Sequence, residues 1–581
     1  MPCDEAVTFR DVNAFHPVIR LERSLYHFRL RARGISRVGK KVIVIGGGVA
    51  GMTAAHELIE RGFDVVVFEL RDIPGGKARS ITNSSEEPAE KCLPGEHGFR
   101  FFPGFYRHVP NTMSRIPLGG GGAVFDNLTQ STRIEVAREG APAVISPAQF
   151  PRSAQEGKLA LEFAWAYGTQ LRIPVGDQIH FGELLATLLS SCERRRFGEY
   201  ENESWWSFSG AETRSKEYGT YMADGLTRTL VAARAREMSA RTGGYILLQL
   251  LQDVAQPGMQ VDRVLNAPTN VAWIQPWLDY LKGKGVDYRL CHRVEAIRST
   301  GSEVTSVAGH EVTWPEQEPT NAFEETADLY IAAVPVEVMQ EGIDIELKKS
   351  VPELAKLDKL KYRWMNGIVF YLAEDVPLIH GHIIFIDSAW SLTAISQRQF
   401  WPDFDLSKLG DGSVKGILSV DISDWETNGC YTARGKPAMD CSKDEVAAEV
   451  WAQLKASLNG SREVLSDKNL VGWFLDPDIV EPNPEGVDIN LEPLLVNVAG
   501  SWNNRPEAAL PEVSNLFLAS DYVRTYTDLA TMEGANEAAR RAVNAILDAT
   551  NSSAKRCQVW KLHELGGPFA LARAADNLLY R

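Results

Sequence analysis

The stretch Lys41-Val-Ile-Val-Ile-Gly-Gly-Gly-Val-Ala-Gly51 decides the fold of this chain of 581 residues. Its apolar run, residues 42–45, is typical of a central parallel strand that is buried on both faces. A glycine-rich turn follows directly, and residues 52–61 are then expected to form a helix that ends at Gly62. Residues 65–69 resemble a second strand. The segment therefore predicts one complete strand–helix–strand unit.

Three glycines and one acidic residue give this unit the pattern of a dinucleotide-binding fingerprint. Gly46 allows the tight turn, Gly48 lets a pyrophosphate approach the backbone, and Gly51 lets the helix pack closely on the strand. The N-terminus of the helix faces the phosphate charge. Glu69 ends the second strand, where it can accept hydrogen bonds from ribose hydroxyls. The fingerprint alone does not distinguish NAD from FAD.

The residues that follow do distinguish them. Glu69-Leu-Arg-Asp-Ile-Pro-Gly-Gly-Lys-Ala-Arg79 resembles the second FAD signature of the FAD-dependent amine oxidase and phytoene desaturase superfamily. Gly75 and Gly76 permit backbone conformations that are closed to other residues. The resemblance implies that Lys77 directs its charge toward the pyrophosphate. Many amine oxidases have arginine here, whereas phytoene-type desaturases often have lysine.

The stretch Gly95-Glu-His-Gly-Phe-Arg-Phe-Phe-Pro-Gly-Phe-Tyr106 resembles the segment that passes over the flavin in phytoene desaturases. The two agree at Glu96, Gly98, Gly104 and Tyr106. They differ at Arg100, because a desaturase commonly has histidine there. A cation at this place would stabilise an anionic reduced flavin, which makes Arg100 the catalytic candidate. The alternative is that Arg100 clamps the FAD phosphates or pairs with Glu96.

Two stretches near the C-terminus, residues 516–521 and 529–540, resemble the closing FAD motif of the superfamily. Asp521 is implied to contact the ribityl-phosphate side of FAD, and the backbone of Val294 to bind the adenine. Thr531, Met532 and Glu533 resemble the turn that opens the last helix under the flavin pyrimidine in this superfamily. A helix N-terminus directs N–H groups and partial positive charge at the flavin edge where negative charge collects on reduction.

The resemblance is closest to the bacterial phytoene desaturase and hydroxysqualene dehydroxylase branch. It implies an α/β fold, in which a split Rossmann-type FAD-binding domain carries an inserted α+β substrate-binding lobe. The expected parts are an N-terminal arm (1–39), an FAD-binding domain (40–115, 268–335 and 495–550), a substrate lobe (116–267 and 336–494) and a C-terminal docking helix (551–581). In that tail, Leu571, Ala575 and Leu578 recur at helical spacing.

Composition and charge narrow the possible partners. A net charge of -15 and a pI near 5.4 argue against nucleic-acid binding. The seven cysteines are scattered without a CxxC pair, so neither a disulfide framework nor a metal site is expected, and a cytoplasmic location fits. No apolar run has the length of a membrane span. The basic residues of the arm could contact an anionic membrane surface, or the arm packs on the acidic body of the protein itself.

We therefore expect an FAD-dependent oxidoreductase in which hydride passes from a largely apolar carbon skeleton to flavin N5. One alternative is an amine or amino-acid oxidase that makes an imine and hydrogen peroxide. A second is a flavoprotein isomerase or dehydratase without net redox chemistry. Because only one dinucleotide fingerprint occurs, oxygen or a quinone is expected as the electron acceptor. No general base can be assigned from the sequence.

Overall fold

The computed structural model describes residues 39–83, 91–151, 156, 167–225, 233–342, 345–460, 462–480 and 489–580. The chain divides into residues Met1–Lys40 and one compact unit, Lys41–Arg581. The architecture below is that of the second unit. The expected N-terminal arm, apart from residue 39, lies outside the described residues.

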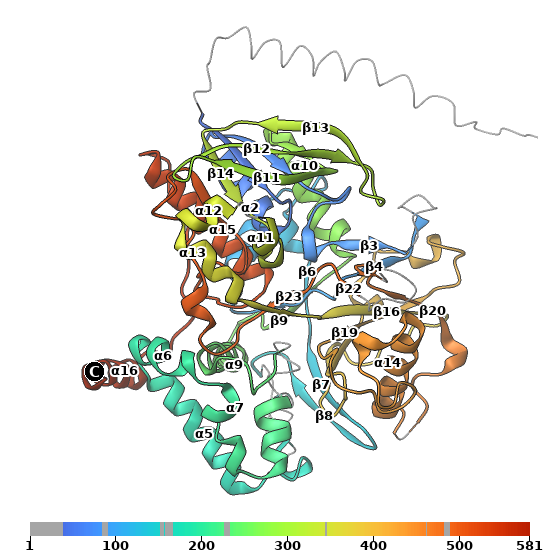
Figure 1. The fold of residues 1–581 in the computed structure, drawn as a ribbon. Coiled ribbons are helices and arrows are strands. Elements are labelled where there is room, and N and C mark those ends of the chain that lie inside the picture. The colour runs from blue at the N-terminus through green and yellow to red at the C-terminus, as the bar shows by residue number, and fades with distance from the viewer. Residues whose placement is uncertain are drawn as a thin grey trace, which may run out of the picture. The chain divides into compact units, whose positions relative to one another are not determined.

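A five-stranded parallel sheet forms the centre of the nucleotide-binding part, in the order β10-β2-β1-β14-β24. Its strand β14 is labelled in Figure 1. Its strands are β10 (Asp287–Arg289), β2 (Asp64–Phe68), β1 (Lys41–Ile45), β14 (Leu329–Ala332) and β24 (Leu516–Leu518). Val42, Ile43 and Val44 are fully buried because β1 has a strand on each side and helices on its faces. The predicted strand–helix–strand unit and the split Rossmann-type domain are confirmed.

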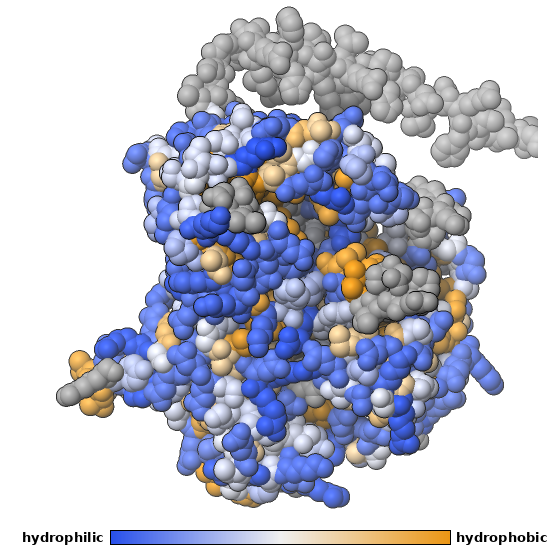
Figure 2. Space-filling view, in the orientation of Figure 1, coloured by the Kyte–Doolittle hydropathy of each residue, from blue (hydrophilic) through white to orange (hydrophobic). Residues whose placement is uncertain are grey.

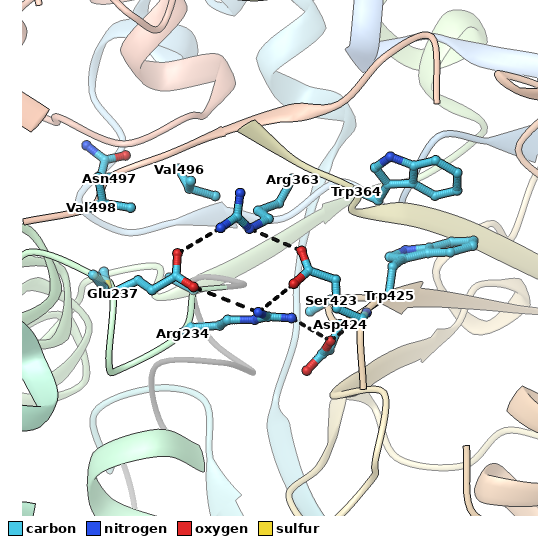
Figure 3. Close-up of a pocket in the computed structure, with 13 residues that line it drawn as sticks. Arg234, Glu237, Arg363, Trp364, Ser423, Asp424, Trp425, Val496, Asn497 and Val498 are labelled. Atoms are coloured by element: carbon cyan, nitrogen blue, oxygen red, sulfur yellow. Dashed lines mark hydrogen bonds and ion pairs between the residues drawn. The ribbon is translucent and has the colours of Figure 1, made fainter. Parts of the chain in front are cut away.

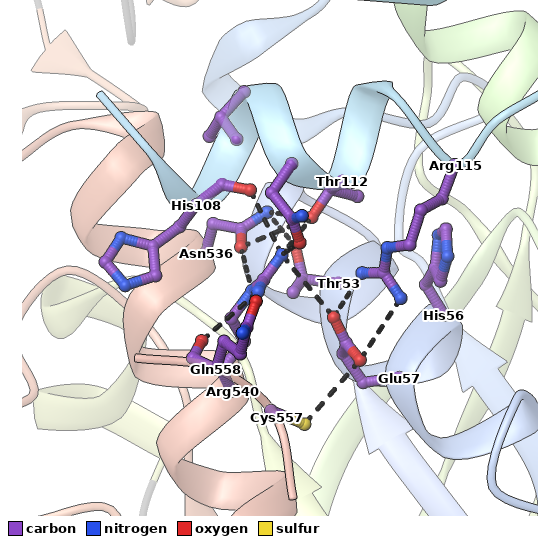
Figure 4. A network of polar contacts seen from close by, with 12 residues as sticks. Thr53, His56, Glu57, His108, Thr112, Arg115, Asn536, Arg540, Cys557 and Gln558 are labelled. Atoms are coloured by element: carbon purple, nitrogen blue, oxygen red, sulfur yellow. Dashed lines mark hydrogen bonds and ion pairs between the residues drawn. The ribbon is translucent and has the colours of Figure 1, made fainter. Parts of the chain in front are cut away.

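Four helices surround this sheet: α2 (Val49–Ile59), α3 (His108–Met113), α10 (Gln275–Lys284) and α15 (Met532–Ala549). A buried polar network joins α2, α3 and α15 (Figure 4). The Asn536 amide donates to Thr53 Oγ1 at 2.9 Å and to Thr112 Oγ1 at 3.0 Å. Glu57 pairs with Arg61 at 2.6 Å and lies 3.5 Å from Arg540. These contacts hold segments together that are almost five hundred residues apart in the chain.

A smaller antiparallel sheet, β11-β12-β13, lies beside the nucleotide-binding sheet. Its strands are β11 (His292–Ser299), β12 (Val304–Val312) and β13 (Pro319–Glu325). Three short helices follow β14: α11 (Val336–Gly342), α12 (Ile345–Ser350) and α13 (Pro352–Ala355). Val336, Met339 and Leu354 belong to the same hydrophobic core as β1. The nucleotide-binding core therefore extends past residue 335, the boundary expected from the sequence.

Both insertions contribute to a seven-stranded sheet in the order β20-β16-β19-β18-β17-β7-β8. The strands are β7 (Arg133–Arg138), β8 (Ala141–Pro147), β16 (Asn366–Leu372), β17 (Gly381–Phe385), β18 (Leu392–Ser396), β19 (Gly416–Ile422) and β20 (Leu470–Leu475). Residues of α14 (Lys443–Leu458), such as Val450 and Leu454, pack in one core with Phe370 and Val420 of this sheet. The helices α5 (Val175–Ser190), α6 (Glu193–Gly198), α7 (Trp205–Phe208) and α9 (Ala240–Ala255) complete the α+β lobe.

Short strand pairs connect these parts. They are β3 (Ser80–Thr82) with β4 (Pro94–Glu96), β5 (Phe102–Pro103) and β6 (Leu128–Gln130) with β9 (Asp262–Leu265), β15 (Lys361–Arg363) with β23 (Leu494–Val496), and β21 (Ile479–Val480) with β22 (Ile489–Asn490). No helix in the described ranges combines the length and the hydropathy needed to cross a bilayer.

The last helix, α16 (Pro568–Leu579), forms where the tail was expected to be helical, but the face that docks differs from the expected one. Leu571 and Leu578 are 75% and 84% exposed, so the residues that set the helical spacing point outward. The helix is held by Asp576, which pairs with Arg195 of α6 at 2.7 Å. The spacing of Leu571 and Leu578 correctly defines one face of the helix. The Asp576–Arg195 ion pair, however, docks the opposite face on the protein.

The network around Glu57 makes a first prediction. Burial raises the pKa of Glu57, but Arg540 and Arg115 outweigh burial and lower it overall. Glu57→Gln should cost about 3 kcal/mol of unfolding free energy at neutral pH, because it removes the carboxylate charge that offsets buried arginines. A carboxyl group whose pKa is lowered on folding stabilises the protein at every pH above its pKa in the unfolded chain. This stabilisation is lost as the pH falls through its pKa in the folded protein.

The difference between variant and wild type should therefore shrink in acid, which denaturant unfolding at neutral and acidic pH can measure. Glu183→Gln, at an exposed position of α5, is the matched control and should change little. A loss for Glu57→Gln that does not depend on pH would show that shape, rather than charge, stabilises this network.

Candidate functional site

Two of the fingerprint glycines, Gly46 and Gly51, occupy positions that no side chain fits. Gly46 has φ +100°, and a Cβ there would lie 2.7 Å from the carbonyl oxygen of Ala333. A Cβ on Gly51 would lie 1.9 Å from the carbonyl oxygen of Gly46. The loop between β1 and α2 therefore presents bare main chain at the carboxyl edge of the sheet, where doubly wound folds bind ligands.

The two glycine signatures, read separately in the sequence, lie against each other. The Gly75 N–H donates to the carbonyl oxygen of Gly47 at 3.0 Å. Gly76 adopts φ +55°, and a Cβ on it would lie 3.0 Å from Cα of Gly48. This glycine clasp, formed by residues 47–48 and 75–76, joins the fingerprint loop to the second signature. Gly75 and Gly76 have positive φ, which favours glycine, whereas a Cβ on Gly47 would lie 2.1 Å from the Tyr288 hydroxyl oxygen.

Glu69 lies at the end of β2 and organises the same loop. Its Oε2 accepts the Gly47 N–H at 2.7 Å, and its Oε1 accepts the Arg71 N–H at 2.9 Å. Burial raises the pKa of Glu69, while these two N–H bonds act in the opposite direction. A carboxylate can accept about four hydrogen bonds, so capacity remains for ribose hydroxyls.

Val294 lies close to this acid in the fold. The His292 N–H, two residues earlier in β11, donates to the carbonyl oxygen of Glu69 at 2.8 Å. The ladder between β11 and β12 shifts register between Val294 and Ala296, and such a bulge frees main-chain groups from the sheet. The structure thus brings together the acid expected to bind ribose and the strand expected to bind adenine.

The Arg100 guanidinium is surrounded by protein, although the residue keeps part of its surface accessible. Its guanidinium donates to the carbonyl oxygens of Lys77 at 2.9 Å and Ala78 at 3.2 Å. Burial lowers the pKa of Arg100, and Glu96 is the carboxylate that most raises it. Arg100 therefore holds the main chain of the second signature, and its role in catalysis stays a prediction.

Lys77 was expected to direct its charge toward a pyrophosphate, but in the structure it contacts other groups of the protein. Its Nζ donates to Glu337 Oε1 at 2.6 Å and also to the carbonyl oxygen of Pro493. The other oxygen of Glu337 is buried and has no hydrogen-bond partner within the described residues. The predicted contact of Lys77 with a pyrophosphate therefore competes with this ion pair.

The closing motif begins α15 as expected. Thr531 caps the helix, since its Oγ1 accepts the Gly534 N–H at 3.1 Å. The N–H groups of Met532 and Glu533 precede the first intrahelical bond and are free to meet a ligand. The Glu533 carboxylate points elsewhere: it accepts the N–H groups of His108 at 2.7 Å and Val109 at 2.9 Å. Only the main chain of Glu533 can therefore serve a flavin.

Two functional candidates near Asp521 escaped the sequence reasoning. Arg505 is fully buried; its Nη1 donates to the carbonyl oxygen of Asp521 at 3.1 Å and pairs with Asp528 at 2.9 Å. Its Nε and Nη2, and the Tyr522 hydroxyl, have no hydrogen-bond partner among the described residues. Buried donors are almost always satisfied, so these groups fit a site for a polar ligand. The bare glycine cradle and these donors together fit a bound nucleotide cofactor.

A polar patch on the seven-stranded sheet faces residues 98–101. Asp421 of β19 accepts the Phe99 N–H at 3.2 Å, and a Cβ on Gly98 would lie 2.7 Å from its Oδ1. Burial raises the pKa of Asp421 to about 7, against the opposing effect of Arg100. The Asp421 carboxyl is likewise surrounded by protein, although the residue is partly accessible. No motif in the insertions indicated this residue.

His382 of β17 lies on the same patch. Its Nδ1 is 2.8 Å from Asp262 Oδ2, and its ring centroid is 5.0 Å from that of Phe99. Its Nε2 is buried without a partner in the described part of the chain. The patch thus combines a carboxyl group and an imidazole, the two groups most often used for proton transfer.

The lining of an open hollow includes Arg234, Arg363, Ser423 and Asn497 (Figure 3). Arg234 pairs with Glu426 at 2.7 Å, and Arg363 pairs with Glu237 at 3.0 Å. Asn497 donates to the carbonyl oxygen of Asp528 at 2.9 Å, three residues before Thr531. Ser423 lies two residues after Asp421 in the chain. Through Asn497, the hollow therefore adjoins the segment that leads into the closing motif.

The second signature is also tied to the substrate lobe by buried charge. His97, Asp476 and Asp478 place possible metal ligands within 4.8 Å of one another. Asp478 is already bound by Arg79 and, at 2.8 Å, by Arg71. The cluster is thus charge-matched by the protein itself, and it fastens residues 71–79 to the inserted segment.

The crowding at Gly46 makes a second prediction. Gly46→Ala should reduce flavin retention at least tenfold, because the new Cβ meets the Ala333 carbonyl oxygen at 2.7 Å. The matched control is Gly62→Ala: Gly62 also has positive φ, +84°, but open space around it. The control should lose about 1 kcal/mol of stability from strain and keep its flavin. The visible absorbance of the purified protein measures the flavin content of each variant. Equal flavin loss in the two variants would contradict the argument that the Cβ at position 46 meets the Ala333 carbonyl oxygen.

The buried carboxyl of Asp421 makes a third prediction. Its pKa is raised to about 7 in the folded protein, from about 4 in an unfolded chain. Only the unfolded chain releases this proton between those values, so the group lowers stability as pH rises across that range. Asp421→Asn should therefore gain stability relative to wild type between about pH 4 and about pH 7. Denaturant unfolding across this range tests it, with exposed Asp411→Asn as the control whose effect stays constant.

Comparison with known proteins agrees with this geometry. The sequence profile of the family described as flavin containing amine oxidoreductase matches residues 49–547. A probable zeta-carotene desaturase of Synechococcus elongatus is 24% identical over 533 residues, which cover 88% of this chain and 99% of that protein. A solved putrescine oxidase has a TM-score of 0.58 at 13% identity, and the match covers 88% of this chain and 99% of that one. A cyclohexylamine oxidase of Brevibacterium oxydans has a TM-score of 0.55 at 14% identity, with the same coverage.

Proposed function

This chain belongs to the flavin-containing amine oxidoreductase family, and from that premise we propose that it is an FAD-dependent desaturase or dehydrogenase of a largely apolar carbon skeleton. Membership makes it a flavin-dependent oxidoreductase. The observation that carries the finer proposal is similarity to a probable zeta-carotene desaturase along nearly the whole of both chains. The solved oxidases are similar in fold only, at 13–14% identity.

FAD, rather than a mononucleotide flavin, is supported by the adenosine side of the site. The glycine clasp suits a pyrophosphate, Glu69 has hydrogen-bonding capacity for ribose, and the bulged strand at Val294 lies beside it. A mononucleotide would leave this end of the cradle unused. Asp521, Arg505 and the N–H groups at the start of α15 would meet the ribityl and flavin end.

The lining of the open hollow bears on the choice of substrate. An amine oxidase with an aromatic cage holds its amine between two rings. Here the rings of Trp364 and Trp425 are in contact, with centroids 5.5 Å apart and planes tilted by 58°. Rings at this separation pack on each other and leave no room for a molecule between them. This pair therefore gives no support to an aromatic cage at the hollow.

When bound, the oxidised flavin supplies a hydride acceptor. Desaturation also removes a proton from the neighbouring carbon, and we assign this proton to Asp421. Burial places the pKa of Asp421 at about 7, where a carboxylate is basic enough to accept a proton and is still partly ionised. Arg100, the principal group that opposes this rise, keeps part of the population ionised. The Asp262–His382 pair on the same patch is placed to pass the proton onward.

We propose oxygen or a quinone as the electron acceptor, a cytoplasmic setting, and no nucleic-acid partner. The chain has one dinucleotide fingerprint and a net charge of -15, which support the first and the last of these. Contact of the N-terminal arm with a membrane stays a proposal, because residues 1–38 lie outside the described part of the chain.

The test is an anaerobic absorbance titration of the holoenzyme with two pools, polyisoprenoids and small amines with amino acids. Bleaching by the polyisoprenoids is the expected outcome. Bleaching by the amines alone would replace the proposal with an amine or amino-acid oxidase, whose turnover releases peroxide. Turnover of an isoprenoid with the flavin still oxidised would indicate the non-redox alternative. Asp421→Asn should slow bleaching at least a hundredfold with flavin content unchanged, given the usual contribution of a general base.

A further inference from the structure

The last helix docks on the protein with its polar side. Asp576 pairs with Arg195 at 2.7 Å and accepts the Cys192 N–H at 2.8 Å. Arg573 donates to the carbonyl oxygens of Leu189 at 2.9 Å and Leu565 at 2.7 Å. The hydrogen bond from Arg195 lowers the pKa of Asp576 to about 2, so the attachment persists throughout the neutral range.

The apolar side of α16 faces outward. Leu571, Leu578 and Leu579 are 75%, 84% and 78% exposed, the highest values among the exposed large apolar residues of the described chain. Residues seven and eight positions apart share a helix face, and the exposed Ala574 and Ala575 lie between the leucines on that face. Figure 2 shows the apolar colour at the place where Figure 1 draws α16. A surface helix of a globular protein normally packs its apolar face against the core.

We propose that this outward face of α16 is a membrane-contact surface, which lies in the interfacial region of a bilayer and inserts Leu571, Leu578 and Leu579. The polar side of the helix stays fastened to α6, so insertion brings the substrate lobe to the lipid. The inference depends on the helix itself. The proposed function adds a reason for it, because an apolar substrate is dissolved in the same bilayer.

A second copy of the chain fits this face less well. A stable interface takes roughly 20–30 residues on each side, which exceeds what a helix of twelve residues offers. Leucines that are about four-fifths exposed project from the surface, so a protein partner would need a matching groove. A bilayer accepts projecting apolar groups of any shape. The expected binding is reversible and of the order of a single acyl chain, about 10⁴ M⁻¹.

The experiment is flotation of the full-length holoenzyme with vesicles of zwitterionic lipid, and with vesicles that also contain anionic lipid. The wild type should float with both, and the double variant Leu571→Gln/Leu578→Gln should lose at least tenfold in partitioning. The control is Val338→Gln on α11, where a valine is 46% exposed outside this face, and it should bind as wild type. Flavin content and unfolding midpoint show that each variant is folded.

Equal partitioning of the wild type and the double variant would overturn the proposal. So would a wild-type dimer in light scattering that the double variant abolishes, because the face would then bind a second copy. Binding that requires anionic lipid and is unchanged in the double variant would also overturn it, because the binding would then come from basic residues outside α16. Vesicle binding does not depend on turnover, so a failure here and a failure of the proposed activity can be told apart.

Discussion

The rest of the site depends on one main-chain contact, the hydrogen bond from the Gly75 N–H to the carbonyl oxygen of Gly47. It closes the glycine clasp and so fixes where the second signature runs. The carbonyl oxygens of Lys77 and Ala78 are then in place to accept the Arg100 guanidinium. Arg100 in turn holds the segment whose Phe99 N–H donates to Asp421. A single chain of contacts leads from the fingerprint loop to Asp421.

The opposite wall of the site is held by buried carboxylates that serve the protein rather than a ligand. Glu533 accepts the first N–H groups of α3, and His108 hydrogen-bonds the same carboxylate through Nδ1 at 2.7 Å. The His108 Nε2 accepts the Trp560 N–H at 3.0 Å, which makes Nδ1–H the donor. The start of α15 is therefore rigid before any cofactor binds, and preorganised dipoles of this kind stabilise developing charge without reorganisation.

Charge joins distant segments of the chain at two places with different exposure. Arg79 and Asp478 are buried, and they fasten the second signature to the inserted segment. Arg234 and Arg363, with Glu237 and Glu426, are about one-third exposed and line the open hollow. Exposed ion pairs contribute at most about 1 kcal/mol each, whereas breaking a buried pair costs several times more. The first junction is thus a permanent attachment, and the second can rearrange with little cost.

The local pattern of the sequence determined the nucleotide-binding half of this protein. A buried strand, a glycine turn and an acid at fixed spacing have one compatible geometry, so β1, α2 and β2 were predictable, as was the Thr531 cap of α15. The family motifs also indicated Glu69, Val294 and Asp521, whose contacts with a cofactor stay predictions. Lys77 shows the limit of prediction from local sequence. Its residue type favoured the desaturases over the amine oxidases, but its ion pair with Glu337 depends on a helix 260 residues away.

Only the tertiary structure decided the features that arise from long-range contacts. Asp421, His382 and Asp262 come from separate strands with no motif, and burial alone gives Asp421 its raised pKa. Arg505 was hidden in an irregular segment, where no periodicity marks a functional side chain. The spacing of Leu571 and Leu578 predicted a helix, yet the Asp576–Arg195 pair decided which side faces the protein. Local sequence specifies backbone geometry and faces, whereas burial, charge partners and docking depend on which distant segments the fold brings together.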